Sequence, residues 1–288
     1  MAERVMNSTV EPTARATPPP AVVLEHVSFS FDDHEVLRDI SLTVPKGSMT
    51  IILGASGAGK SVLLKLILGL FRPDSGAIVV NGHRIDTMAE RDLLTLRSDV
   101  GMLFQESALF DSLTIEENVA YPLVNQKAIQ CPLDEVEGKV KEALHFVELD
   151  RTQARFPSEL SGGMRRRAAI ARAVVTTPPL LLYDSPTAGL DPITAHTIMA
   201  LIIKERDLSN TTTLIVTYRY QDGNLMANFR YNPDNGQLVP ARENGHRPQL
   251  RTKFIVLREG KLVFAGTQTE LEASNDEYIA KFRRQTGG

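Results

Sequence analysis

The sequence predicts an α/β fold with a mixed, largely parallel β-sheet, and two observations carry this prediction. The apolar runs at 180–183 and 213–216 are continuous rather than alternating, which is typical of strands buried on both faces of a parallel sheet. A third apolar run, at 49–53, leads directly into a glycine-rich loop and then into an apolar helix. This strand, loop and helix order belongs to α/β folds.

The remaining expected elements follow along the chain. Apolar and polar side chains alternate along residues 22–31, which predicts a strand. Residues 40–44 predict a second strand that ends at the turn residues Pro45-Lys46-Gly47. Val136, Val140, Leu144 and Val147 have helical spacing. The other expectations are a helix at about 59–70, strands at 77–80 and 100–104, a helix-rich middle at about 114–173 with a helix at 135–149, a hairpin at 254–257 and 262–265, and a terminal helix at 269–284.

Composition excludes several classes of protein. The chain has 288 residues and a formal charge of −3, so it lacks the basic excess of nucleic-acid binders, and we expect no nucleic-acid partner. Its single cysteine, Cys131, excludes an internal disulfide and fits a reducing compartment. Because no apolar run approaches the ~20 residues of a spanning helix, we expect no direct membrane span, and any membrane contact must come through a partner.

The expected domain organisation is simple. Residues 1–20 contain three consecutive prolines and no apolar core of a signal peptide, so we expect a disordered tail. Residues 21–284 are expected to form one domain, because no internal repeat is present. Within it we expect a helical subdomain at about 106–173 and an insertion at about 219–253.

The glycine-rich loop matches the phosphate-loop pattern G-x-x-x-x-G-K-[ST] in full. Its glycines let backbone N–H groups wrap phosphates, and the helix N-terminus adds positive potential. Lys60 would reach the β- and γ-phosphates, and the Ser61 hydroxyl would ligate Mg²⁺. A chance match would lack the flanking strand and helix that are expected here. The predicted nucleotide-contacting residues are Gly54, Ala55, Ser56, Gly57, Ala58, Gly59, Lys60, Ser61 and Val62.

Two further residues are candidates for the metal shell. Asp184 ends the buried run 180–183, where a carboxylate can hold Mg²⁺. The alternative is a helix-capping aspartate, but Ser185-Pro186-Thr187 does not start a helix cleanly. Gln105 follows the strand at 100–104 and can contact Mg²⁺ and the attacking water. Its position between the two nucleotide motifs favours this role over an ordinary surface glutamine.

The sequence Leu160-Ser161-Gly162-Gly163-Met164, called the LSGGM motif below, opens a helix that carries Arg165, Arg166, Arg167 and Arg172. The Ser161 hydroxyl and the N–H groups of Gly162 and Gly163 lie at a helix N-terminus, which suits a terminal phosphate. One chain cannot bring this surface to its own phosphate loop. The motif therefore implies a head-to-tail dimer with two ATP molecules between the chains. At least some of the arginines are expected on a solvated face.

The phosphate loop, the LSGGM motif and the buried strand ending in Asp184, in that order, resemble the ATP-binding subunits of ABC transporters. The resemblance covers about residues 22–282. It implies a P-loop NTPase core of the ABC ATPase type, with a mixed sheet, an antiparallel β subdomain and an α-helical signature subdomain. Met164, the arginine-rich helix and residues 189–194 are similar to the ATPases of bacterial lipid-trafficking importers of the Mla and Mce type.

This resemblance implies further roles and partners. Phe31 would stack on adenine, residues 188–191 would meet their counterpart across the dimer, and residues 106–117 would lie near the groove for a coupling helix of the permease. The implied partners are a second nucleotide-binding subunit, of the same or a different chain, and a membrane permease. The implied location is cytoplasmic, peripheral on the inner face of the plasma membrane, and the implied cargo is lipid-like.

Two positions depart from the family pattern, and both concern hydrolysis. Ser185 stands where such proteins carry the glutamate that polarises the attacking water, and a hydroxyl has no useful basicity at neutral pH. Tyr218 stands where a histidine contacts the γ-phosphate, and a phenol is neutral at that pH. Losing a general base costs roughly 10²- to 10⁴-fold in rate. We therefore expect Mg-ATP binding and dimerisation with slow turnover at the catalytic positions Gln105, Ser185 and Tyr218.

Two alternatives stay open at this point. A nucleotide-dependent regulatory cassette would explain the departures, although the transporter-like length and motif order disfavour it. A cassette of translation or DNA repair is disfavoured because those usually carry paired cassettes or long coiled-coil inserts. Within the insertion, Asn235-Gly236 between 229–231 and 238–239 predicts a hairpin. The insertion is either a flexible surface excursion or a docking site for a regulator.

Overall fold

The computed structural model describes residues 19–209, 211–241 and 252–284. The tail expected at 1–20 therefore lies outside the described residues, apart from its last two positions. Within the described part, no helix is both long enough and apolar enough to span a bilayer.

The main sheet has six strands in the order β12-β11-β3-β8-β7-β6. All neighbours run parallel except β12, which is antiparallel to β11. In register, Leu53 of β3 pairs with Thr217 of β8, and Asp184 of β7 pairs with Val216. The carboxyl ends of these strands therefore meet at one edge. The strands are β3 (Met49–Leu53), β6 (Val100–Leu103), β7 (Leu180–Asp184), β8 (Thr212–Thr217), β11 (Thr252–Arg258) and β12 (Lys261–Gly266).

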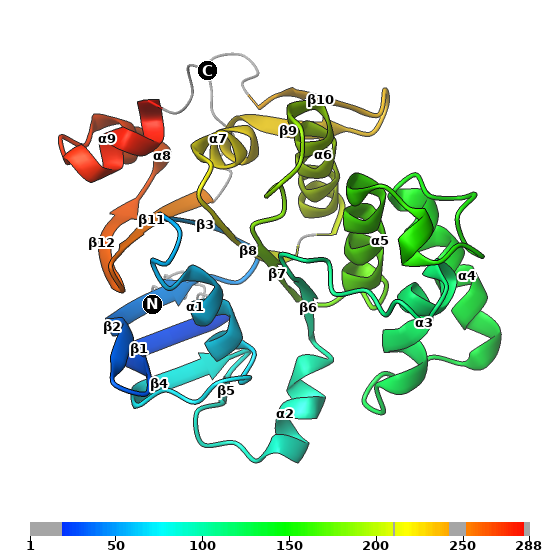
Figure 1. Ribbon diagram of the computed structural model, residues 1–288, viewed down its shortest axis with the longest axis horizontal. Helices are drawn as coiled ribbons and strands as arrows, with labels where there is room; N and C mark the ends of the chain where they lie inside the picture. Colours follow the sequence, from blue (N-terminus) through cyan, green and yellow to red (C-terminus); the bar gives the residue numbers. More distant parts are fainter. Residues whose placement is uncertain (1–18, 210, 242–251, 285–288) are drawn as a thin grey trace, which may run out of the picture.

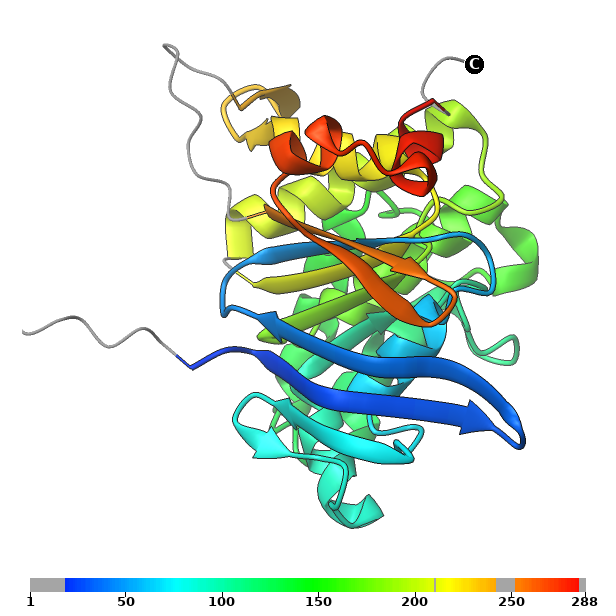
Figure 2. The ribbon, with the colours of Figure 1, turned by 90° about the vertical axis from the view of Figure 1, so that its left-hand side faces the viewer.

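A second, antiparallel sheet has the order β2-β1-β4-β5 and lies beside β12 (Figure 2). The strand expected at 40–44 begins earlier, at His34, because it pairs with β1 from Phe31↔His34 to Val22↔Val44. This pairing extends the strand across a stretch whose local pattern is irregular. The strands are β1 (Val22–Phe31), β2 (His34–Val44), β4 (Ser75–Val80) and β5 (His83–Arg84).

Two hydrophobic cores cover the two faces of the main sheet, as its continuous apolar strands predict. Ile52 faces a core shared with the antiparallel sheet and with helix α1 (Lys60–Ile67). Ile51 and Leu53 face the other core, which is built with helices. These helices lie together on one side in Figure 1 and are α3 (Ile115–Asn125), α4 (Leu133–Phe146), α5 (Gly162–Val174) and α6 (Pro192–Ser209).

Helix α5 begins at the LSGGM motif. The Ser161 hydroxyl accepts a hydrogen bond from Met164 N at 3.3 Å, so this serine is the N-cap of the helix. The 3₁₀ turn η1 (Pro157–Glu159) precedes it. Helices α3 and α4 pack against α5, forming the helical region expected around the motif.

The single terminal helix expected at 269–284 is wrong, because the segment forms α8 (Gln268–Ala273) and α9 (Glu277–Arg284). Ser274 is extended, with ψ 133°. The Asp276 carboxylate then accepts hydrogen bonds from Tyr278 N and Ile279 N at 2.7 and 3.0 Å. Such side-chain bonds satisfy the free N–H groups of a new helix start, so the chain turns here.

The described part of the insertion contains α7 (Tyr220–Asn228) and a two-stranded hairpin. Strands β9 (Phe229–Asn232) and β10 (Gln237–Pro240) pair antiparallel, with Gln237 opposite Asn232. The hairpin predicted around Asn235-Gly236 is thus confirmed, and it packs on α6 through β9. Residues 242–251 of the insertion lie outside the described residues. Helix α2 (Glu90–Arg97), like α6, was not anticipated from the sequence.

Candidate functional site

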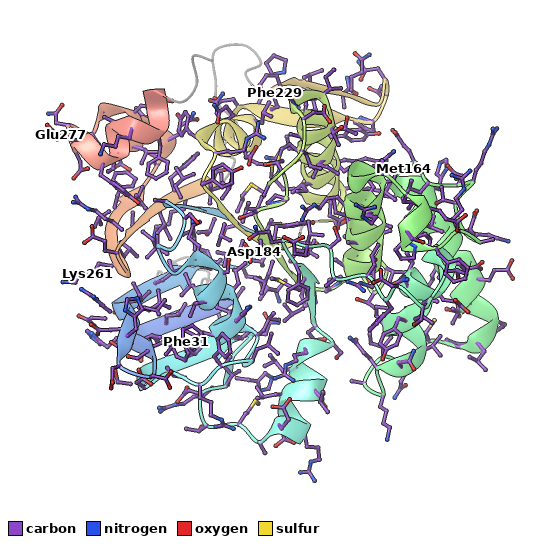
Figure 3. All side chains as sticks on the ribbon, viewed as in Figure 1. Phe31, Met164, Asp184, Phe229, Lys261 and Glu277 are labelled. Carbon is purple, nitrogen blue, oxygen red and sulfur yellow. The ribbon has the colours of Figure 1, made fainter. Side chains whose placement is uncertain are left out.

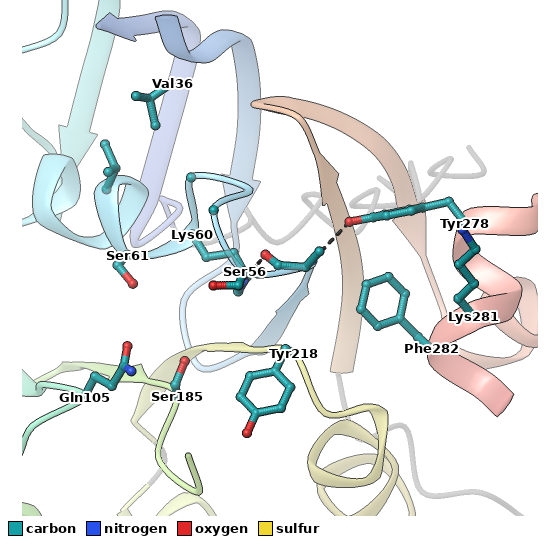
Figure 4. A pocket seen from close by; sticks show the side chains of 14 residues that line it. Val36, Ser56, Lys60, Ser61, Gln105, Ser185, Tyr218, Tyr278, Lys281 and Phe282 are labelled. Carbon is teal, nitrogen blue, oxygen red and sulfur yellow. Dashed lines mark hydrogen bonds between the residues drawn. The ribbon is translucent and has the colours of Figure 1, made fainter. Parts of the chain in front are cut away.

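A cavity of about 590 Å³ opens where the carboxyl ends of β3, β7 and β8 meet. One wall is the glycine-rich loop and the start of α1, which contribute residues between 55 and 62. Gln105, Ser185 and Tyr218 line it from the ends of β6, β7 and β8. Figure 4 shows the Gln105 and Ser185 side chains across the cavity from Ser56 and Ser61, with Tyr218 beside them and its ring directed away. The fold therefore assembles most of the predicted site residues.

The backbone of the loop requires glycine at two positions. Gly57 and Gly59 have φ values of 79° and 96°, a left-handed region that other L-residues rarely adopt. A Cβ at Gly59 would also stand 2.6 Å from Leu37 Cδ2 and 3.1 Å from Val36 O. Leu63 N bonds to Gly59 O at 2.9 Å, and the N–H groups of the first helical turn before it have no intrahelical partners. Such amides form a concave donor set that suits phosphate oxygens.

Lys60 is held at the back of this loop. It is 7% exposed, and its ammonium donates to Gly54 O at 2.9 Å and Ala55 O at 2.7 Å. Burial lowers the pKa of Lys60, while the nearby Asp184 charge raises it. A buried cation whose hydrogen-bond acceptors are neutral carbonyls is poorly compensated. A phosphate is therefore a better partner than the carbonyls it now contacts, and the residues present fit a polyphosphate.

The candidate metal donors come from both sides of the cavity. Ser61 lines it from the loop wall and Gln105 from the facing wall, whereas Asp184 is not among the lining residues. Asp184 is 4% exposed, and the Ser185 hydroxyl, which does line the cavity, donates to its Oδ1 at 3.3 Å. Among the described residues, no cluster of three His, Cys, Asp or Glu side chains could hold a metal by itself. One carboxylate with a hydroxyl fits Mg²⁺, which usually takes few protein ligands and completes its shell with phosphates and water.

Ser185 and Tyr218 are fixed in relation to each other by a buried carboxyl. Thr187 Oγ1 and Thr217 Oγ1 donate to Asp222 Oδ2 at 2.6 and 2.9 Å. Burial raises the pKa of Asp222 despite these two donors. Ser185 N also donates to Val216 O at 2.8 Å. The loop after β7 is thus bonded to the end of β8 and to α7, and these contacts fix the backbone at Ser185 and on either side of Tyr218.

Phe31 is not among the residues that line the cavity. Its side chain is 45% exposed and packs edge-on against Phe29 and Phe71, with ring centroids 4.9 and 5.4 Å away. Val36, five residues further along, lines the cavity instead. The adenine-stacking role of Phe31 stays a prediction.

The LSGGM motif lies away from the cavity of its own chain. Ser161 and Gly162 are exposed, and neither lines the cavity. Figure 3 shows Met164 well to one side of Asp184. This placement agrees with the expectation that the motif serves a second chain.

Besides Val36, three further cavity residues were not anticipated, and they all belong to α9: Tyr278, Lys281 and Phe282. The Tyr278 hydroxyl accepts from Ala55 N at 3.0 Å and donates to Leu257 O at 3.1 Å. Arg258 lies over its ring, 5.2 Å from the centroid. The spacing 278, 281, 282 indicates a shared helical face, but no local signal links that face to a loop more than 200 residues earlier.

A second cavity, of about 290 Å³, lies between α3, α5 and the end of β6. Phe104, Phe110 and Tyr121 line it, and the rings of Phe110 and Tyr121 are 4.6 Å apart. Arg172 donates to Ala108 O at 2.8 Å and supports this wall. Of the region 106–117, Ala108 and Phe110 line this cavity, and its role beside a permease stays a prediction.

Comparison with known proteins finds a matching family model and several similar sequences. A family model described as "ABC transporter" matches residues 37–188. A "Probable ribonucleotide transport ATP-binding protein mkl" of Mycobacterium tuberculosis is 39% identical over 189 residues, covering 66% of this chain and 52% of that protein. The "Intermembrane phospholipid transport system ATP-binding protein MlaF" of Escherichia coli K12 is 41% identical over 197 residues, covering 68% and 72%. The chain thus spans about half the length of the mycobacterial relative.

Two solved structures have the same fold. A dimeric post-hydrolysis state of the ATP-binding cassette MJ0796, bound to ADP and Pi, has a TM-score of 0.70 at 27% identity, covering 85% of this chain and 98% of that one. The cbiO1 protein of Clostridium perfringens, part of the transporter complex cbiONQ, has a TM-score of 0.72 at 25% identity, covering 92% and 94%. The match therefore extends over most of the described residues.

Proposed function

Because the chain belongs to the ABC transporter family, we propose that it is the ATP-binding subunit of a transporter and binds Mg-ATP in the 590 Å³ cavity. One observation carries this proposal. The phosphate-loop wall with Ser61, and the residues Gln105, Ser185 and Tyr218, converge on one cavity although they lie far apart in the sequence. The MJ0796 structure with ADP and Pi supports nucleotide binding by this fold.

The residues of the chain have distinct tasks in this proposal. Amides of the loop and of the first turn of α1 hold the phosphate oxygens, and Lys60 exchanges its carbonyl partners for them. Ser61 and Asp184 hold the metal, with Gln105 beside them. Bound Mg-ATP supplies the charge that the donors complement and the phosphate that is cleaved.

The complete site needs a second copy or a second cassette. Ser161, Gly162 and Gly163 are placed at the start of α5, outside the cavity of their own chain. Their N–H groups and the serine hydroxyl suit the terminal phosphate bound by another chain. We therefore propose a head-to-tail dimer, and the dimeric state of the MJ0796 relative supports it.

Hydrolysis by this site is proposed to be slow. Ser185 and Tyr218 line the cavity where a general base and a γ-phosphate ligand are needed, and neither side chain supplies a base at neutral pH. A phosphate-release assay on the purified chain tests this directly. We expect turnover well below about 10 s⁻¹, a typical enzyme value, and turnover near that value would contradict the proposal.

The partner in the membrane is proposed to be a permease whose helix docks in the groove beside Phe110 and Tyr121. Such docking would hold the chain at the cytoplasmic face. A lipid-like cargo is supported by the phospholipid transport named for MlaF, whereas mkl is named for ribonucleotide transport. A Phe110→Asp variant should bind Mg-ATP normally and lose co-purification with the permease.

One observation favours a second candidate, a nucleotide-dependent regulator that binds ATP as a switch. It is the joint presence of Ser185 and Tyr218 in a cavity that is otherwise well formed for Mg-ATP. Co-expression of the chain with the membrane proteins encoded by neighbouring genes distinguishes the transporter subunit from the regulator. Co-purification with a permease supports the transporter subunit, and ATP-dependent capture by a partner other than a permease supports the regulator.

A further inference from the structure

Arg166 is the most deeply buried charged group of α5. The residue is 6% exposed, although it lies among consecutive arginines at the start of a helix. Its Nη1 donates to Phe104 O at 3.2 Å and also to Gln105 O, and its Nη2 donates to Ala188 O at 3.3 Å. One guanidinium thus binds three backbone carbonyls.

The three carbonyls come from two loops that meet at the nucleotide cavity. Phe104 and Gln105 follow β6, and the Gln105 side chain lines the cavity. Ala188 lies in the loop that follows β7, three residues after Ser185. Arg166 itself belongs to the first two turns of the helix that begins with the LSGGM motif. The guanidinium therefore connects the motif to both loops.

The neighbouring arginines make different contacts. Arg165 donates to Leu160 O at 2.5 Å, within its own segment. Arg167 donates to Val147 O and Glu148 O at 3.2 and 3.4 Å, within the helical region. Arg172 reaches Ser107 O and Ala108 O, beyond Gln105. Among the described contacts of these four arginines, those of Arg166 alone join both cavity loops.

Burial of this cation is costly, so its position is specific. Desolvation lowers the pKa of Arg166, opposed by the charges of Glu106 and Asp184, and arginine nevertheless remains charged in proteins. Its Nε is buried and has no hydrogen-bond partner in the described part of the chain. An apolar residue at this position would pack without burying a charge and without leaving an N–H group unpaired.

We infer that Arg166 is a positioning residue that makes the orientation of the LSGGM motif depend on the two loops at the nucleotide cavity. This inference rests on the proposed Mg-ATP binding and dimerisation. The guanidinium is planar and rigid, so a displacement of Gln105 or of the 185–191 loop moves α5 with it. In this way occupancy of the cavity in one chain sets the surface that the same chain presents to the phosphates of its partner.

Three variants separate this role from a purely structural one. Arg166→Gln removes the charge and the fork of donors, and Arg166→Lys keeps the charge without the fork. Arg167→Gln is the matched control, because it removes an adjacent arginine whose described contacts stay within the helical region. For each, calorimetry measures the Kd for Mg-ATP, light scattering measures Mg-ATP-driven dimerisation, and hydrogen exchange measures the protection of amides 160–166.

Arg166→Gln should bind Mg-ATP within about threefold of the wild type, since Arg166 contacts backbone rather than ligand. Its dimerisation should weaken by about tenfold or more, because the LSGGM motif is no longer held in the orientation that binds the partner's phosphate; tenfold corresponds to about 1.4 kcal/mol. Mg-ATP should no longer protect amides 160–166 in it. Dimerisation and amide protection in Arg166→Lys should be intermediate between those of the wild type and Arg166→Gln. Both should equal the wild-type values in Arg167→Gln.

Wild-type dimerisation and protection in Arg166→Gln would overturn the inference. So would a parallel loss of Mg-ATP affinity and thermal stability in both Arg166 variants, because that pattern marks a structural role. A wild-type chain that stayed a protomer with Mg-ATP would instead refute the proposed dimer. The exchange comparison would then still decide the role of Arg166, since it needs only the protomer.

Discussion

The two walls of the nucleotide cavity are built on different principles. The wall formed by the loop at 54–61 relies on backbone N–H groups, on glycine conformations and on one buried lysine. The facing wall relies on the side chains at the ends of β6, β7 and β8, namely Gln105, Ser185 and Tyr218. Both walls are held firmly, the second through Asp222 and the bond from Ser185 N to Val216 O. Position and reactivity are therefore separable, because the fold fixes the backbone at Ser185 and Tyr218 whatever the basicity of their side chains.

The largest effect is expected when the facing wall receives the glutamate and histidine that are usual in the family. The double change Ser185→Glu with Tyr218→His should raise kcat by about 10²- to 10⁴-fold, because it supplies a general base at a position that is already fixed. Phosphate release at saturating Mg-ATP measures the gain. The matched control, Ser185→Gln with Tyr218→His, keeps the histidine but lacks the carboxylate at position 185, and it should gain far less. Equal rates in the two double variants would show that the position is not suited to a base.

Substitutions in the loop wall should change the affinity for Mg-ATP rather than the turnover rate. Lys60→Ala should weaken Mg-ATP affinity by about 10²-fold, since it removes a desolvated cation from the phosphates. The control is Lys65→Ala on the same helix, whose ammonium lies 5.5 Å from the centre of the Phe71 ring. Calorimetry should give the wild-type Kd for that control. A normal Kd for Lys60→Ala would contradict the assignment of the cavity.

The glycines of the loop offer a test of its backbone. Gly59→Ala should lower the free energy of unfolding by about 2 kcal/mol or more, because its Cβ combines left-handed strain with a close approach to Leu37 and Val36. Gly57→Ala meets nothing within 4 Å, so it should cost only the strain, about 1 kcal/mol. Urea unfolding monitored by circular dichroism compares them. Equal costs would mean that space around Gly59 is not limiting.

The contact between α9 and the loop should have a smaller effect. Tyr278→Phe removes the acceptor of Ala55 N–H and should lower the free energy of unfolding by about 1 kcal/mol. Mg-ATP affinity should fall by about two- to fivefold, because the loop is less well ordered before binding. Tyr121→Phe, on α3 and outside this cavity, is the control for loss of a phenol. A Tyr278→Phe variant with wild-type stability would leave the hydroxyl without a role in the loop.

The hairpin β9–β10 should matter least to the cavity. Replacing residues 230–239 with a short turn should leave Mg-ATP affinity within about twofold, because the hairpin packs on α6 and not on either wall. Some loss of stability is expected, since Lys204 lies over the Phe146 and Tyr231 rings at 4.3 and 5.6 Å. Complex assembly measured on the same variant decides between the two interpretations of the insertion. Unimpaired assembly favours a surface excursion, and lost assembly favours a docking site.

The sequence predicts the loop wall and the facing wall for physical reasons that are local. The strands at 49–53, 180–183 and 213–216 are short apolar runs, and their carboxyl ends share an edge in any parallel sheet. Residues just after those runs, such as Ser185 and Tyr218, must therefore gather there, and so must Gln105, which follows the strand predicted at 100–104. The sequence motifs and the shared edge of the parallel strands indicate the same positions, so these residues could be predicted to lie together from the sequence.

Other features depend on contacts that no local pattern contains. Tyr278 reaches Ala55 across 223 residues, so its role in the cavity follows only from the packing of α9. Helix α6 buries Ile198, Met199, Leu201, Ile202 and Ile203, which lie on several faces, and so it lacks a clear amphipathic period. Phe31 is an aromatic residue, as expected for adenine stacking, but its ring packs against Phe29 and Phe71. The local sequence does not predict these ring contacts.

The account depends most on whether two chains close around Mg-ATP. Multi-angle light scattering of the wild-type chain, with and without saturating Mg-ATP, measures this directly. Slow turnover predicts a stable species of twice the protomer mass with nucleotide, which returns to the protomer mass when magnesium is chelated. A protomer mass at saturation, in a sample that calorimetry shows to be fully liganded, would contradict it.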